Sequence, residues 1–125
     1  ELQRAAIAKL LLPEPEVIFL DEATKGMDAF FKAEFGALLR RLAARGTAIV
    51  LVSHDIEFCA EFADRCAMFF NGTVIAEGTP QEVFLGNSFY TTSACRISRG
   101  IIPDALTSEQ VIDYANRCER KKNDA

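Results

Sequence analysis

The sequence has no tryptophan, a single histidine, four prolines and four cysteines in 125 residues. Ten phenylalanines and an apolar share of 50% still supply enough hydrophobic surface for one ordinary globular domain, which argues against intrinsic disorder. Basic residues are in the minority, 14 against 18 acidic ones, so the net charge is −4. Without a basic surplus to neutralise phosphates, nucleic acid is not an expected partner.

Long hydrophobic runs are missing as well. The longest apolar runs, residues 5–8, 10–12 and 48–52, are far shorter than the roughly 18 residues of a membrane-spanning helix. Any association with a membrane is therefore expected to be peripheral. The first residue, Glu1, is not methionine, no signal segment follows it, and a helical pattern already includes it, so we expect a fragment of a longer protein.

The cysteines form no C-x-x-C pair, and no histidine is near enough to complete a tetrahedral metal set. A zinc site is therefore not expected. Cys59 and Cys66 lie in strongly apolar surroundings and are interpreted as small core residues. Free thiols of this kind favour a reducing compartment, the cytosol.

The first half of the chain predicts an α/β fold. The short apolar run 17–20 is typical of a parallel strand buried on both faces. Asp28 can cap an amphipathic helix that Gly46 ends, and residues 47–52 form a second apolar, β-branched strand. Strand, helix and strand in this order predict a βαβ unit, preceded by a helix over residues 2–12.

The second half contains local signals of turns and caps. Asp55 can cap a short helix, and Asn71-Gly72 between two apolar runs predicts an antiparallel hairpin. Capping boxes at 79–82 and 107–110 predict two further helices. The stretch between them, residues 86–106, has little periodicity and is predicted to be a linker.

Side chains that could carry chemistry follow the two predicted parallel strands. Asp21 and Glu22 come directly after the first strand, and His54 follows the second. Open α/β sheets bind ligands at the carboxyl ends of their strands, so these three residues are expected at one edge. Paired carboxylates there suit phosphoryl transfer, in which one holds Mg²⁺ and the other polarises a water. A solvated strand end and a purely structural histidine remain the alternatives.

Three motifs, in the order and spacing of the family, resemble the C-terminal half of an ABC transporter ATPase: residues 2–8 (LQRAAIA), 17–28 (VIFLDEATKGMD) and 51–55 (LVSHD). Each short string is weak alone, but together they are specific. The hairpin glycine and the stretch 78–84 are also similar to the family. The resemblance covers about residues 1–85.

The resemblance implies a role for each matching residue. Asp21 would help to position Mg²⁺, Glu22 would be the general base for the attacking water, and His54 would contact the γ-phosphate of ATP. Asp28 would lie in the loop that faces the second ATPase subunit, and Glu1 would be the last position of the signature motif that contacts nucleotide. The sequence contains no G-x-x-x-x-G-K-[ST] loop to hold the phosphates, so the fragment alone is expected to be inactive.

The downstream residues 87–94 and 101–103 are similar to the ATPases of energy-coupling-factor importers, which serve vitamins and transition-metal ions. This resemblance implies a partial ABC ATPase domain over residues 1–85 and a small helical C-terminal extension over 86–125, with a possible part in dimerisation. It also implies a second ATPase subunit, transmembrane partner subunits and a place on the cytoplasmic face of the membrane. Two alternatives stay open: a non-catalytic dimerisation or regulatory module, and a chromosome-maintenance or repair ATPase of the same superfamily, whose coiled-coil insertions are absent here.

Overall fold

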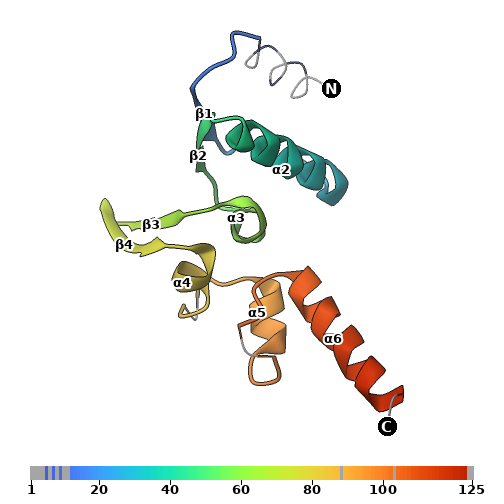
Figure 1. Ribbon diagram of the computed structural model, residues 1–125. Helices are drawn as coiled ribbons and strands as arrows, with labels where there is room; N and C mark the ends of the chain where they lie inside the picture. The colour runs from blue at the N-terminus through green and yellow to red at the C-terminus, as the bar shows by residue number, and fades with distance from the viewer. Residues whose placement is uncertain are drawn as a thin grey trace. The chain divides into compact units, whose positions relative to one another are not determined.

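A computed structural model describes residues 5, 7, 9, 12–87, 89–102 and 104–123 of the chain (Figure 1). The chain divides into two compact units, residues 1–54 and residues 55–125, which we call the first and the second unit. The helix expected over residues 2–12 falls largely outside the described residues, although Ala5, Ile7 and Lys9 are helical. Glu1 also lies outside them.

The first unit is a βαβ unit, as the sequence predicted. It consists of β1 (Val17–Asp21), α2 (Ala29–Ala44) and β2 (Ala48–Val52). The two strands pair in parallel over their whole length, with Val17 opposite Ala48 and Asp21 opposite Val52. Both strands therefore end at the same edge of the sheet (Figure 1).

Local sequence signals set the bounds of α2. The Asp28 carboxylate accepts a hydrogen bond of 2.7 Å from the backbone N–H of Phe31, which satisfies one of the amide groups left free at a helix start. At the other end, Gly46 adopts a φ of +98° and its N–H bonds to the carbonyl of Ala43. Phe35, Gly36 and Leu39 form the buried face of the helix.

The prediction that the first strand is buried on both faces is wrong for this unit. Ile18 in β1 is only 3% exposed, whereas its neighbour Phe19 is 75% exposed. In β2, Val50 and Val52 are likewise exposed. Successive side chains of a strand point to opposite faces, and α2 packs against the sheet on one of them, so alternate apolar residues meet solvent.

The second unit contains α3 (Ile56–Phe62), β3 (Cys66–Phe70), β4 (Thr73–Gly78), α4 (Pro80–Phe84), α5 (Ser93–Ser98) and α6 (Ser108–Asn123). β3 and β4 form the predicted antiparallel hairpin, with a register irregularity between Met68 and Phe69. Asn71 and Gly72 in the turn both have positive φ, +48° and +76°. Two such residues are what a two-residue hairpin loop requires.

The predicted caps of this unit are confirmed. The Asp55 carboxylate accepts from the N–H of Phe58 at 3.1 Å at the start of α3. At α4, Thr79 and Glu82 bond reciprocally as a capping box. No helix in the described part of the chain has the length and apolar character to cross a membrane.

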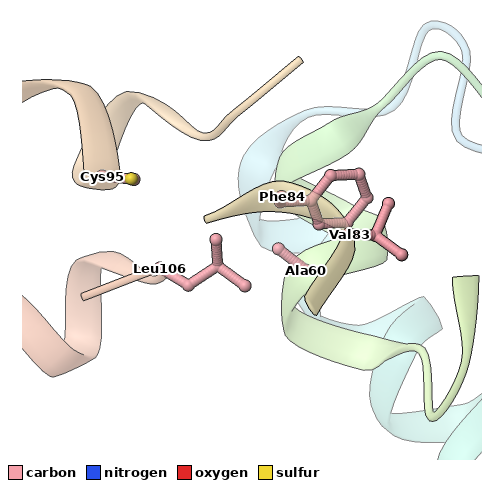
Figure 2. Packing of buried hydrophobic residues seen from close by; sticks show 5 residues of the cluster. All are labelled: Ala60, Val83, Phe84, Cys95 and Leu106. Carbon is pink, nitrogen blue, oxygen red and sulfur yellow. The ribbon is translucent and has the colours of Figure 1, made fainter. Parts of the chain in front are cut away.

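The core of the second unit joins segments that are distant in sequence. Figure 2 shows five buried residues that form one cluster, drawn from α3, α4, α5 and the stretch before α6: Ala60, Val83, Phe84, Cys95 and Leu106. Leu106 is fully buried. The prediction of a linker over residues 86–106 is therefore wrong. This stretch contains the short helix α5. Its buried apolar residues follow neither a helical nor a strand period, because contacts with other elements bury them, so hydrophobic periodicity could not predict them.

Candidate active site

The candidate site lies in the first unit, at the carboxyl ends of β1 and β2. Asp21 is the last residue of β1, and Glu22 follows it directly. Ser53 and His54 follow β2 in the same way. The parallel register therefore brings the predicted residues from the two strands to one edge, as expected.

Glu22 has an unusual backbone conformation. Its φ is +48°, in the left-handed region, where a residue with a Cβ costs about 1–2 kcal/mol. Its N–H donates to the carbonyl of Val52 at 2.8 Å and so extends the pairing of the strands by one residue. Its own carbonyl accepts from the N–H of Lys25 at 3.0 Å, which closes a turn. Non-glycine residues held in this conformation cluster at functional sites.

The Glu22 carboxylate contacts His54 in two ways. Its Oε1 accepts a hydrogen bond of 3.0 Å from the backbone N–H of His54, and the same oxygen lies 3.9 Å from Nε2 of the imidazole. The imidazole is 98% exposed and the Glu22 side chain 35% exposed. A side-chain contact with an imidazole this exposed contributes little to stability. The backbone hydrogen bond is therefore what orients the carboxylate, while the ring stays open to a ligand.

Two further predicted site residues, Asp21 and Asp28, have different surroundings in the structure. Asp21 is exposed at the end of β1. Within the described residues, no group of three or more His, Cys, Asp and Glu side chains could hold a metal ion. One exposed carboxylate still suits Mg²⁺, which commonly binds through one or two carboxylates together with waters and substrate phosphates. The Asp28 carboxylate caps α2, so a structural role is visible for it, and its role toward nucleotide stays a prediction.

Sequence reasoning missed two residues at this edge. The hydroxyls of Thr24 and Ser53 lie 3.3 Å apart, within hydrogen-bond reach. Thr24 is only 3% exposed. Ser53 directly follows β2, and Thr24 is the third residue after β1, so the argument that brought His54 to Glu22 could also have found them.

No model of a protein family matches the chain. Among curated proteins, the chain is 47% identical over 113 residues, 90% of its length, to a protein of Bacillus thuringiensis named as an ABC transporter ATP-binding protein, of which it covers 20%. It is 35% identical over 99 residues, 79% of its length, to the energy-coupling factor transporter ATP-binding protein EcfA of Methanothermobacter thermautotrophicus, of which it covers 32%.

Solved structures give the same class. The structure of cbiO1 from Clostridium perfringens, part of the ABC transporter complex cbiONQ, matches 64% of the chain at 37% identity with a TM-score of 0.59, and the chain covers 32% of it. The homologues of this protein are thus ATP-binding proteins of ABC transporters, and the chain covers part of an ABC ATPase region. The EcfA proteins and cbiO1 are among these homologues. The chain spans about a fifth of the length of the first curated relatives.

Proposed function

We propose that this chain supplies the hydrolytic edge of the ATP-binding and ATP-hydrolysing subunit of an ABC-type importer of the energy-coupling-factor kind. The observation that carries the proposal is the Glu22 carboxylate, held on the backbone N–H of His54 beside an exposed imidazole at the end of two parallel strands. The similarity to EcfA and to cbiO1 supports the transporter class.

Each side chain then has a separate task. Glu22 accepts the proton of the attacking water, and the backbone bond to His54 keeps its carboxylate aimed as it does so. The exposed His54 ring donates to the γ-phosphate. Asp21 would hold Mg²⁺, which when bound neutralises charge on the phosphate oxygens. Glu1 and Asp28 are proposed nucleotide contacts on the resemblance alone.

The proposed subunit acts with partner subunits. ATP would lie between this subunit and a second ATPase subunit or half, and the pair would drive transmembrane subunits from the cytoplasmic face of the membrane.

The chain by itself contains no G-x-x-x-x-G-K-[ST] loop to cradle the phosphates. We therefore expect calorimetry on the isolated 125-residue chain to show no saturable binding of Mg-ATP. Micromolar affinity with turnover would contradict this expectation.

The test of the function is the substitution of Glu22 by glutamine in the full-length subunit. Glu22→Gln keeps the shape of the side chain but removes its basicity, so ATP binding should persist while turnover falls about 100-fold or more, in the range of general-base catalysis. His54→Ala should impair turnover similarly. Glu16→Gln is the matched control, because Glu16 is an exposed glutamate at the opposite end of β1. Normal turnover in Glu22→Gln would assign the base to another residue.

A second candidate function, a non-catalytic dimerisation module, is favoured by apolar side chains that the second unit leaves exposed. Ile97 and Ile101 are 80% and 73% exposed, and Phe89 is 87% exposed. If these side chains join two copies, replacing Ile97 and Ile101 by serine should convert a dimer to a monomer in light scattering. A protein that is monomeric before and after the change would contradict it.

A further inference from the structure

The contact between Thr24 and Ser53 has no part in the chemistry described above. Thr24 lies in the turn after β1 and is 3% exposed, and Ser53, directly after β2, is half-buried. Their hydroxyl oxygens are 3.3 Å apart, and either can donate to the other. A buried hydroxyl without a hydrogen bond would be costly, so this contact compensates for the burial of Thr24.

Two further hydrogen bonds join the turn after β1 to the end of β2 and the turn that follows it. The N–H of Glu22 donates to the carbonyl of Val52 at 2.8 Å. The N–H of His54 donates to the carboxylate of Glu22 at 3.0 Å. The hydroxyl pair comes third and is the only one of these three that leaves the backbone out. Together they attach the segment 22–24 to the segment 52–54.

The turn around Thr24 is also fixed from its other side. The carbonyl of Thr24 accepts from the N–H of Met27 at 3.2 Å, and Met27 is itself buried. Glu22 sits between these attachments with a φ of +48°, a conformation that its own side chain disfavours. A strained residue stays in place only when its surroundings over-determine its position. The attachments supply that constraint.

We propose that Thr24 and Ser53 are positioning residues for Glu22: their hydroxyl pair keeps the two turns in the relative position at which the Glu22 carboxylate meets the N–H of His54. The proposal rests on the proposed function, because it assigns a task toward the base named there. It predicts that loss of the hydroxyl pair acts on the hydrolytic step, since neither hydroxyl is assigned to nucleotide binding.

The experiment compares variants of the full-length ATP-binding subunit. Thr24→Val replaces the hydroxyl by a methyl group of similar size and should lower kcat for ATP hydrolysis about 3- to 10-fold, the effect of one hydrogen bond, with KM unchanged. Thr24→Ser restores a hydroxyl and should restore kcat. Ser53→Ala should reproduce the effect of Thr24→Val, and it serves as the test if Thr24→Val does not fold. Thr73→Val, at an exposed threonine in β4, is the control.

A second arm separates this proposal from the proposed function. If Thr24 acts through Glu22, Thr24→Val should lower turnover no further in a Glu22→Gln background. A Thr24→Val enzyme with normal kcat, beside an inactive Glu22→Gln enzyme, would overturn the positioning role and leave the function standing. A normal Glu22→Gln enzyme would overturn the proposed function itself. A full additional loss in the double variant would show that Thr24 acts independently of Glu22 and would also overturn the positioning role.

Discussion

Replacing Leu106 by alanine should strongly destabilise the second unit. The side chain is fully buried within the cluster that joins α3, α4 and α5 (Figure 2). The change removes three methylene equivalents, which at about 0.8 kcal/mol each lowers the free energy of unfolding by about 2.4 kcal/mol. The cavity left behind adds to this, and buried Leu→Ala changes typically cost about 2–5 kcal/mol in total.

Urea unfolding followed by circular dichroism would measure the effect. With a slope of about 1 kcal/mol per molar urea, expected for a small unit, the midpoint should fall by about 2 M or more. Ile97→Ala is the matched control, because Ile97 in α5 is 80% exposed and its truncation should cost no more than about 0.5 kcal/mol. Equal midpoints for the two variants would refute the reasoning. Leu106→Met, which should cost less than about 1.5 kcal/mol, replaces Leu106→Ala if that variant does not fold.

Three further predictions concern local contacts. A Cβ at Gly78 would lie 2.5 Å from Oε2 of Glu82, so Gly78→Ala should displace this carboxylate from the N–H of Thr79. The amides at the start of α4 should then exchange hydrogen faster, and the Tm of the protein should fall. Hydrogen bonds from Thr79 hold the pKa of Glu82 below its ordinary 4.5. The ionised carboxylate therefore stabilises the folded protein at pH values above 4.5, and this stabilisation is lost as the pH falls through the lowered pKa of the folded state. The Tm of Glu82→Ala should accordingly lie below the unsubstituted protein's at pH 7, and the two should converge in acid. Burial raises the pKa of the Cys66 thiol, so at pH 8 maleimide should modify it more slowly than the exposed Cys118.

The elements that the sequence predicted correctly are those with short-range signals. Asp28, Asp55 and Thr79 each bond to an amide three residues later, so a window of four residues contains the cap and its partner. The turn at Asn71-Gly72 is equally local, because it depends on two residues that tolerate positive φ. These local signals correctly predicted the first residues of α2, α3 and α4 and the position of the hairpin turn.

The parts that escaped prediction depend on contacts between distant segments. Cys95 and Leu106 are buried because they pack against residues of α3 and α4. No helical or strand period within residues 86–106 predicts that burial. In the site, strand order brought Glu22 and His54 to one edge, but the left-handed conformation of Glu22 follows from its bonds to Val52 and Lys25. Nothing in the residue type of a glutamate predicts that conformation.

The pairing register of β1 and β2 determines which changes of chain length this protein can tolerate. Asp21 lies opposite Val52, so both site turns start at the same level of the sheet. An added residue in the loop between α2 and β2 lengthens only the connection, and loop insertions cost little. One added residue within β1 would instead shift the strand by about 3.3 Å and turn every later side chain to the opposite face. In homologous chains, insertions should therefore fall after α2 and be absent between Val17 and Asp28.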